Sequence, residues 1–564
     1  MKGFDKQNKF FKKKKSEFET NKSNTKILNQ ALLFQSQGNI SEAKKYYTYL
    51  IERGFKDYRV FANCGLIFAS MNKFKEAELY TRKSISLNPN LAMAHCNLGS
   101  ILINLGKLEE AELYTRKAIS LNPNLAMAYS NLGGVLIDLW KLEEAEFYTR
   151  KAIKIKPNYA MAYCNLGNTL KSLGKLEEAE LYTRKAISLD PNLAMAHCNL
   201  GSILIDLGKL EDAKLSLMQS ISLNPNLCRS YVSLSNLKYE KKNQHFLNTL
   251  FSKSILKNSI KKDQIDIFFA RANILHKEKK FKESAENLKL ANNLKLSIYP
   301  SETNIFIKKS SSLHKESKKL KINQKQSIHY PQSIFIVGMP RSGSTLVESI
   351  LSMNSDVYDL GEINIFEKSF LEWKKENKKK SLNNIYQKKI TKDVNKYKIT
   401  TNKWLYNYQY AGIIANEIFN SKIIYCFRNP LDNILSIYRA HFARGNNYSS
   451  SLVDCAKIYL DQKQIMTKYQ NEFGSKIYKL NYDLLVSDYR KEIKSLVCWL
   501  GWKWNDSYLS PHLSKRSIST RSNVEVRSPI NSKSVGGWKN YKEMLKPAIE
   551  IINRCDEYQE TNEN

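Results

Sequence analysis

Long apolar runs are missing from this chain of 564 residues, although 42% of its residues are hydrophobic. No stretch of about 18 consecutive apolar residues occurs, so a membrane-spanning helix is not expected. The basic N-terminus, Met1 to Lys15, lacks the apolar core of a signal peptide. Both absences make the cytoplasm the expected location. The chain is too long for a single core, and its length indicates roughly two to four domains.

Paired cysteines and metal-ligand clusters are also missing. The chain has nine cysteines, but Cys96, Cys164 and Cys198 occupy the same place in different copies of a repeat, which indicates duplication rather than pairing. Buried reduced thiols are therefore expected. His441 and His512 have no evident partner and are expected to be incidental. No cysteine–histidine group has the spacing of a metal site, so we predict no metal.

Negative charge is scarce relative to positive charge. There are 89 Lys and Arg residues against 54 Asp and Glu residues, for a formal net charge of +35. Such an excess is one signature of a nucleic-acid partner. However, the charge is spread along the whole length of a chain rich in Lys, Asn, Ile and Tyr, which is typical of a biased coding composition. We therefore predict no nucleic-acid partner, but a field that attracts anions.

An internal repeat of 34 residues organises the first part of the chain. Each copy indicates two helices, as from Met93 to Leu105 and from Leu108 to Ala118. A proline stops the second helix, because proline cannot continue it. Small residues recur where the paired helices would approach closely. The recurring positions are Pro89, Pro123, Pro157, Pro191 and Pro225; Gly65, Gly99, Gly133, Gly167 and Gly201; and Ala77, Ala111, Ala145, Ala179 and Ala213.

The period, the small residues and the closing proline resemble the tetratricopeptide repeat over about residues 27–226. The resemblance implies an α-solenoid whose concave face binds a peptide or protein partner. A spacer or dimerisation surface without a specific ligand is the alternative. One asparagine recurs in each copy, and its amide could hold an extended peptide or could cap or bridge neighbouring helices. The four are Asn97, Asn131, Asn165 and Asn199.

The sequence pattern changes after the repeats. A degenerate repeat surrounds Phe281 to Ala291, and residues 293–331 loosen into a linker or an irregular helical connector. Strand–loop–helix units follow, which indicates an α/β domain with a parallel sheet. The predicted segments are a basic N-terminal segment (1–26), the repeat array (27–238), a degenerate helical repeat with a linker (239–330), the α/β domain (331–552) and a tail (553–564).

A phosphate-binding loop begins the α/β domain. The apolar run Ser333 to Val337 reads as a buried strand, and Gly338-Met-Pro-Arg-Ser-Gly-Ser-Thr345 follows it directly, before an expected helix. A strand, a glycine-bearing turn and a helix N-terminus together expose backbone N–H groups to an anion. The two glycines have Walker A spacing, but Ser344 stands where a nucleoside triphosphatase keeps its lysine. This argues against a kinase or nucleoside triphosphatase.

A second strand supplies another anion site. Lys422 to Phe427 reads as a buried strand, Arg428 leaves its end, and Ser436 lies two turns into the next helix. Both side chains can reach one phosphate at the carboxyl edge of the sheet, where open α/β sheets bind their ligands.

Together these segments resemble the sulfotransferase family, whose donor is 3′-phosphoadenosine 5′-phosphosulfate (PAPS). Pro340 to Thr345 matches the family's 5′-phosphosulfate loop, and Arg428 with Ser436 matches its 3′-phosphate site. Arg341 and the Gly361-Glu362 pair place the resemblance nearest the tyrosylprotein sulfotransferase branch. Bacterial proteins that join a tetratricopeptide array to such a domain show the same layout. The donor-binding residues that the resemblance implies are Arg341, Ser342, Gly343, Ser344, Thr345, Arg428, Ser436 and Tyr482.

The resemblance also implies catalytic roles. Glu362 is the candidate base for the acceptor hydroxyl, and Arg341 contacts the sulfate. Lys403 matches a lysine that stabilises the leaving phosphate, although Asn402 stands where the family often has an aspartate. Gly536 stands where tyrosylprotein enzymes have a catalytic serine.

The sequence therefore predicts a PAPS-dependent sulfotransferase that modifies a hydroxyl of a protein or glycan acceptor. The repeat array would bind a partner or the acceptor. The alternative is a repeat scaffold with a nucleotide-binding but inactive sulfotransferase-like domain, which the departures at Asn402 and Gly536 favour.

Overall fold

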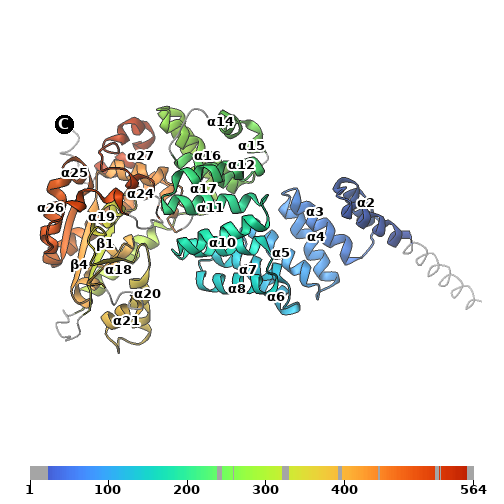
Figure 1. The fold of residues 1–564 in the computed structure, drawn as a ribbon, viewed down its shortest axis with the longest axis horizontal. Coiled ribbons are helices and arrows are strands. Elements are labelled where there is room, and N and C mark those ends of the chain that lie inside the picture. Colours follow the sequence, from blue (N-terminus) through green and yellow to red (C-terminus); the bar gives the residue numbers. More distant parts are fainter. Residues whose placement is uncertain are drawn as a thin grey trace, which may run out of the picture. The chain divides into compact units, whose positions relative to one another are not determined.

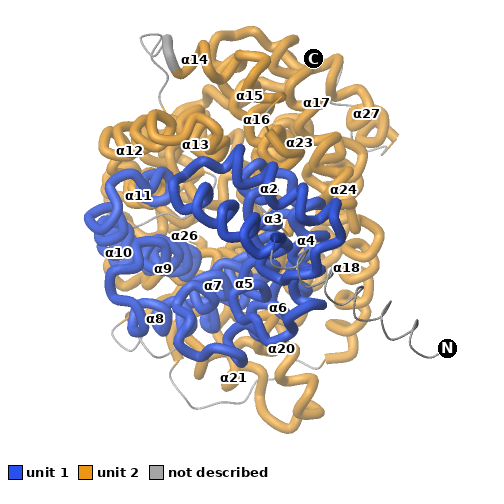
Figure 2. Tube along the Cα trace, turned by 90° about the vertical axis from the view of Figure 1, so that its right-hand side faces the viewer, with its two compact units in different colours: residues 1–200 blue, residues 201–564 orange. Residues whose placement is uncertain are grey.

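The computed structural model describes residues 23–237, 244–257, 259–320, 330–390, 397–442, 445–514, 520 and 522–554. They belong to two compact units, residues 1–200 and 201–564, which are blue and orange in Figure 2. The boundary falls inside helix α11 (Ala194–Leu207). The domain limits inferred from the sequence are not decided by this division and stay predictions.

Unit 1 consists of helices in consecutive pairs, as the repeat pattern predicts (Figure 1). Within a pair the backbones lie close together: a Cβ added to Gly99 would stand 2.2 Å from Thr115 Oγ1, so only glycine fits there. The helical segments are residues 23–36, α2 (Ile40–Glu52), α3 (Tyr58–Ser70), α4 (Phe74–Leu87), α5 (Ala92–Asn104), α6 (Leu108–Leu121), α7 (Ala126–Asp138), α8 (Leu142–Ile155), α9 (Ala160–Ser172), α10 (Leu176–Leu189) and the start of α11.

A polar ladder joins successive repeats along their second helices. Arg116 pairs with Glu112 of its own helix at 2.8 Å and with Glu144 of the next repeat at 2.7 Å. Its guanidinium also donates to Tyr148 Oη at 2.9 Å. Arg82 and Arg150 make the same three kinds of contact one repeat earlier and later. Each pair is partly exposed and weak alone, but the ladder fixes the register between repeats.

The recurring asparagines bridge neighbouring repeats. Asn165 Nδ2 donates to Ser130 Oγ at 3.0 Å, and Asn131 Nδ2 lies 3.4 Å from Cys96 Sγ. Of the two roles left open by the sequence, bridging is the one that these contacts support. The thiols beside them are buried and reduced, and burial raises the pKa of Cys96 to about 12.

Unit 2 begins with further helices before its sheet. α16 and α17 form the later repeat predicted around Phe281. α18 lies within the segment predicted to be a linker or an irregular connector. It is an ordered helix packed on the α/β domain, since Gln409 Nε2 donates to Ser310 Oγ at 2.9 Å. These helices are the end of α11, α12 (Leu210–Leu223), α13 (Cys228–Asn236), α14 (Gln244–Phe251), α15 (Lys253–Lys257), α16 (Lys261–Lys277), α17 (Phe281–Ile298) and α18 (Thr303–Ser317).

The sheet of unit 2 has five parallel strands in the order β2-β3-β1-β4-β5. The central strand β1 pairs with both β3 and β4, so the chain moves to one side of β1 and then to the other. This is the arrangement whose carboxyl edge binds ligands in open α/β sheets. The strands are β1 (Gln332–Gly338), β2 (Val357–Asp359), β3 (Ile399–Asn402), β4 (Ser421–Phe427) and β5 (Ile477–Asn481).

Alternate residues of β1 build two cores, one on each face of the sheet. Phe335 and Val337 pack against α20, α21, α22 and α24, whereas Ile334 and Ile336 pack against α19 and α26. All four side chains are fully buried. The remaining helices of this part are α19 (Ser344–Leu351), α20 (Ile365–Lys375), α21 (Leu382–Ile390), α22 (Ala411–Glu417), α23 (Pro430–Arg439), α24 (Leu452–Phe473), α25 (Tyr482–Ser487), α26 (Tyr489–Leu500) and α27 (Lys542–Asn553).

Short 3-10 turns complete the unit, among them η1 (Leu405–Tyr410), η6 (Glu525–Arg527) and η7 (Gly537–Tyr541). In the part of the chain that the structure describes, no helix combines the length and apolar composition needed to cross a membrane. The predicted fold class, a helical repeat array followed by an α/β domain with a parallel sheet, is confirmed.

Candidate active site

Every strand of the sheet is followed directly by residues that the sequence predicts for the site. Because all five strands are parallel, these residues gather at one edge. The set is the loop Gly338–Thr345 after β1, Glu362 in the turn after β2, Lys403 after β3, Arg428 after β4 and Tyr482 after β5.

The loop after β1 has a strained backbone and is held from two sides. Arg341 has φ 67° and Gly343 has φ 90°, which is left-handed backbone that glycine adopts at least cost. A Cβ on Gly343 would lie 2.2 Å from Tyr482 Cδ2, so the Tyr482 ring packs directly against the backbone of the loop. On the other side Asn433 Nδ2 donates to Pro340 O at 3.0 Å.

The loop ends at the N-terminus of α19, with three hydroxyl side chains around it. Ser342, Ser344 and Thr345 are at most 5% exposed, and Ser342 Oγ has no hydrogen-bond partner among the described residues. A buried hydroxyl without a partner costs free energy unless a ligand satisfies it. Together with the unpaired N–H groups at the start of α19, this set suits an anion.

Arg341 lies at the centre of a contact network. Its guanidinium donates to Ser436 Oγ at 3.0 Å and to Ser522 Oγ at 2.5 Å. It also forms an ion pair with Glu525 at 2.5 Å, although the Glu525 side chain is 63% exposed. The structure therefore brings Arg341 and Ser436 together, and adds an acidic partner from the C-terminal segment that the sequence did not indicate.

Arg428 and Tyr482 form a second cationic site beside the loop. Arg428 is 5% exposed, and its guanidinium lies 4.7 Å from the centre of the Tyr482 ring. It donates to Ser534 O at 2.8 Å, and Tyr482 Oη contacts Ser534 Oγ at 3.0 Å. The nearest carboxylates, of Asp483 and Asp432, are 3.8 and 4.0 Å away. These are loose contacts for a buried guanidinium, which leaves it available to an anion.

Glu362 and Lys403 form an ion pair at 2.6 Å. The Lys403 side chain is fully buried, whereas that of Glu362 is 39% exposed and can meet a substrate. Lys403 Nζ also lies 3.5 Å from Thr345 Oγ1 and 3.6 Å from the fully buried Glu348. The site thus joins a partly exposed carboxylate, a buried ammonium group and the hydroxyl end of the loop.

Residues 331–506 match the sulfotransferase family, and residues 58–227 match the tetratricopeptide repeat in five successive copies. The chain thus carries a C-terminal sulfotransferase domain. The predicted combination of repeats with such a domain is confirmed. One curated relative is an uncharacterized protein of Aquifex aeolicus (strain VF5), 31% identical in an alignment of 242 residues that covers 39% of this chain. The chain spans about a third of that protein, since 32% of its length is covered.

Several solved structures are similar to part of this chain. One is YrrB, described as a tetratricopeptide-repeat protein with an unusual peptide-binding site, at 24% identity over 33% of this chain and 95% of that chain, with a TM-score of 0.25. Another is TTC0263 of Thermus thermophilus, at 16% identity over 35% and 100%, with a TM-score of 0.30. The type IV pilus biogenesis factor PilW has 20% identity over 40% and 98%, with a TM-score of 0.33.

Two residues of the sulfotransferase domain join the site without having been predicted. Arg439 lies three residues beyond Ser436 on α23, with its guanidinium 5.9 Å from the centre of the Tyr541 ring, and burial lowers its pKa. Asp432 accepts hydrogen bonds from the backbone of Gly536 at 2.7 Å and Trp538 at 2.9 Å. The available signals were the position of Arg439 one helical turn after Ser436 and that of Asp432 in the first turn of α23, four residues after Arg428.

Gly536 has a structural task in this chain. Its φ of 73° is left-handed, and its N–H is held by Asp432, so the turn before η7 depends on glycine.

His441 was expected to be unpaired, and this was wrong. Its Nε2 lies 2.6 Å from Asp266 Oδ1 on α16, and its ring stacks on Phe269. Burial acts to raise the pKa of Asp266, but the hydrogen bond with His441 and the nearby charges of His441, Arg229 and Lys262 together lower it.

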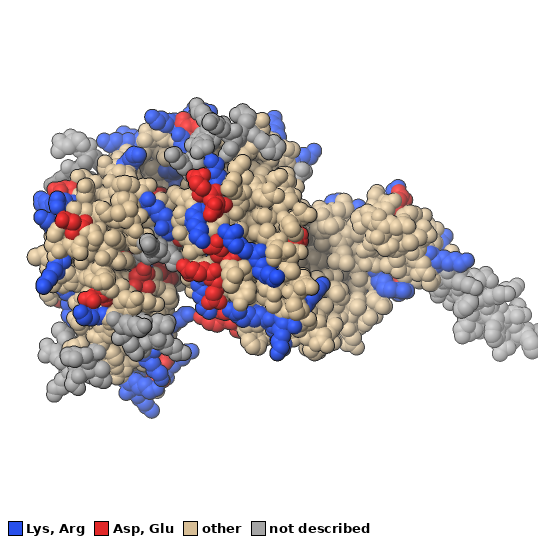
Figure 3. All heavy atoms as spheres, in the orientation of Figure 1, with Lys and Arg blue, Asp and Glu red and all other residues tan. Residues whose placement is uncertain are grey.

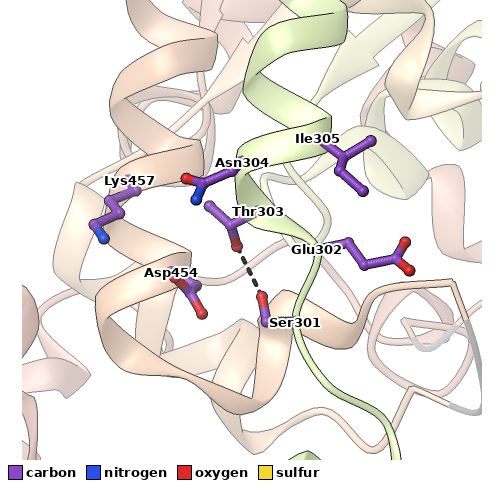
Figure 4. A pocket seen from close by; sticks show the side chains of 7 residues that line it. All are labelled: Ser301, Glu302, Thr303, Asn304, Ile305, Asp454 and Lys457. Carbon is purple, nitrogen blue, oxygen red and sulfur yellow. Dashed lines mark hydrogen bonds between the residues drawn. The ribbon is translucent and has the colours of Figure 1, made fainter.

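The hollow in Figure 4 lies away from these residues. It has a volume of about 260 Å³ and is formed by residues 301–305, just before and at the start of α18, and by two side chains of α24, with Ser301 and Thr303 hydrogen-bonded at 2.8 Å. None of the predicted site residues lines it. Among the described residues, no group of three or more His, Cys, Asp or Glu side chains could hold a metal ion.

Proposed function

We propose that the chain is a sulfotransferase that transfers a sulfuryl group from PAPS to a hydroxyl of a protein or glycan acceptor. The observation that carries the proposal is the gathering of an anion-binding loop, a second arginine and the Glu362–Lys403 pair at one sheet edge. A triphosphatase would need a lysine in the loop, where Ser344 stands.

The residues present fit the two phosphate groups of this donor. The loop hydroxyls, with Ser342 Oγ unsatisfied, and the start of α19 would hold the 5′-phosphosulfate. Arg428 is held mainly by a ring and a backbone carbonyl, and would pair with the 3′-phosphate. Ser436 would share the 3′-phosphate with Arg428, and in the structure its hydroxyl accepts a hydrogen bond from Arg341 of the loop.

Glu362 would act as the base. Its partly exposed carboxylate can take the proton of the acceptor hydroxyl while the new oxygen–sulfur bond forms and the bond from sulfur to the leaving phosphate breaks. Lys403 and Arg341 would balance the negative charge that builds up on the leaving group. Lys403 contacts both Glu362 and Thr345, so one ammonium group spans the base and the loop.

We further propose that the repeat array binds the acceptor protein or a partner that presents the acceptor. The support is the array itself, because stacked helix pairs offer an extended surface for a peptide. The inactive-scaffold alternative predicts nucleotide binding without transfer, so an activity measurement separates the two.

A transfer assay with ³⁵S-labelled PAPS and candidate protein and glycan acceptors tests the proposal. Wild-type protein should give labelled product, and Glu362→Gln should bind donor normally but turn over at least about 100-fold more slowly, since it cannot accept the proton. Glu372→Gln is the matched control, because Glu372 forms a similar pair with Lys389 at 2.7 Å on the surface of α20. Normal turnover by Glu362→Gln would remove Glu362 as the base.

A further inference from the structure

Asn402 is the last residue of β3 and directly precedes Lys403. Its side chain is 1% exposed. Resting on the proposed function, we infer that Asn402 is a positioning residue that holds the Glu362 turn in place against Lys403, and that the reaction requires its amide. Asn402 is thus part of the working site, and not a sign of lost activity.

The backbone on both sides of Glu362 is fastened to the end of β3. Gly361 O accepts a hydrogen bond from Lys403 N at 3.1 Å. Ile363 O accepts one from Asn402 Nδ2, also at 3.1 Å. One residue earlier, Leu360 N donates to Thr401 O at 2.9 Å. Glu362 therefore lies between two carbonyl groups that are held by the consecutive residues Asn402 and Lys403, and this sets where its carboxylate stands.

The second half of the amide has its own partners. Asn402 Oδ1 accepts from Asn407 Nδ2 at 2.8 Å and from Trp404 N at 3.3 Å. A backbone carbonyl can only accept and a backbone N–H can only donate, so Ile363 and Trp404 together fix which way the amide points. An ionised aspartate has no donor and cannot make the bond to Ile363. Only an amide serves both sides of this turn.

An aspartate would also add charge to a crowded group. Glu362 faces Lys403 at 2.6 Å, Lys403 faces Glu348 at 3.6 Å, and the charge of Glu362 also acts on Tyr406, whose pKa is raised mainly by burial. A third carboxylate beside one lysine favours protonation of its neighbours. The base would then hold its proton to a higher pH, and the acid limb of the rate profile would move with it.

The test compares Asn402→Asp and Asn402→Ala with Asn416→Asp. Asn416 is a matched control on α22, because it is 6% exposed and its Nδ2 donates to Ser317 O at 3.2 Å. In the transfer assay, Asn402→Asp should lower kcat at least about tenfold and move the acid limb up by about one pH unit. Asn402→Ala should lower kcat without moving the limb. Donor KM should stay within about twofold in both, because Arg341 and Arg428 are untouched.

Amide hydrogen exchange supplies a readout that does not depend on activity. The amides of residues 360–365 should exchange faster in both Asn402 variants, because these variants release the Glu362 turn. In Asn416→Asp the same amides should exchange at the wild-type rate. Unchanged exchange in the Asn402 variants overturns the inference. Equal kcat losses in Asn402→Asp and Asn416→Asp, without a shift of the limb, also overturn it. If the wild-type protein transfers no sulfate, the proposed function fails and exchange alone decides the positioning role.

Discussion

Gly343 shows how single residues set the shape of the anion site. It combines a left-handed φ of 90° with a backbone that lies against the Tyr482 ring. Tyr482 in turn stacks under the guanidinium of Arg428. A side chain at position 343 would therefore disturb both anion-binding groups at once.

We predict that Gly343→Ala weakens binding of adenosine 3′,5′-bisphosphate at least about tenfold, because the added methyl group pushes Tyr482 away from Arg428. Calorimetry or fluorescence titration measures the change. Gly474→Ala in the same domain is a suitable control. A Cβ added to Gly474 would lie 3.6 Å from the flexible side chain of Gln470, which is an ordinary contact. Equal affinity of Gly343→Ala and wild type for the bisphosphate would show that close packing of the Tyr482 ring on Gly343 is not needed for binding.

At this scale the loop after β1 and Arg428 could be predicted from the sequence itself, because a buried apolar run followed by Gly or Arg leaves a local signal. Glu362 and Lys403 were named through the resemblance to the sulfotransferase family. The positions of Glu362 and Lys403 could be named, but not their pairing at 2.6 Å, since that depends on β2 and β3 being neighbours in the sheet. Glu525 was not predicted, because its contact with Arg341 joins residues 184 positions apart.

Among the structural elements, the segment from Ser522 to η7 has contacts on two sides. Ser522 and Glu525 contact Arg341. Asn523 Nδ2 contacts Asp206 Oδ1 at 2.5 Å, and Arg527 donates to Asp206 O at 3.0 Å, both near the end of α11. Within unit 2, therefore, one short stretch touches both a repeat helix and the anion site.

The Glu525 carboxylate occupies a place against Arg341 that a donor anion would need. Glu525→Gln should therefore tighten donor binding about two- to fivefold, the modest effect expected when an exposed ion pair is removed. Titration of wild type and variant measures it. Glu543→Gln, which breaks the Glu543–Lys546 pair on α27, should leave affinity unchanged. Weaker binding by Glu525→Gln would mean that Glu525 orients Arg341 instead of competing for it.

A hydrogen-bonded chain fastens the other end of this segment. His276 Nδ1 contacts Tyr541 Oη at 2.8 Å, and Tyr541 Oη donates to Ser284 Oγ at 3.0 Å. Burial, helped by the nearby charge of Arg439, lowers the pKa of His276 from 6.5 to about 3. The folded protein therefore keeps His276 neutral, whereas the unfolded chain protonates it below its ordinary pKa.

The free energy of unfolding should therefore fall as pH drops below about 6.5, by at most about 1.4 kcal/mol per pH unit from this group. Urea unfolding of wild type and His276→Gln at about pH 7.5 and about pH 5.5 measures the effect. Between the higher and the lower pH, His276→Gln should lose less free energy of unfolding than the wild type. His197→Gln, at a half-buried histidine of unit 1 that contacts Pro191 O, should behave as wild type. Identical pH dependence of all three proteins would contradict the assignment.

At the scale of the whole chain, the sequence predicted the repeats and the sheet domain more easily than the boundary between them. The 34-residue period records local packing that each repeat makes again, so it survives in the sequence. The compact units divide inside α11, because contacts such as Asn523 with Asp206 join distant parts of the chain. No local pattern reports such contacts.

The net charge of +35 has no single location on the face shown in Figure 3. There, blue and red side chains are intermixed. Within the repeats, Arg116 forms ion pairs with both Glu112 and Glu144. A general attraction for anions follows from the net charge. Selection of one anion has to come from the buried groups at the sheet edge.

The most direct test of the account is therefore calorimetric binding of adenosine 3′,5′-bisphosphate compared with adenosine 5′-diphosphate. A site with separate 5′ and 3′ phosphate positions should bind the bisphosphate at least about 100-fold more tightly, without a divalent cation, and Arg428→Ala should remove most of that preference. Equal affinity for the two nucleotides, or tighter binding of the diphosphate with Mg²⁺, would contradict the assignment of Arg428 and the loop to a PAPS site.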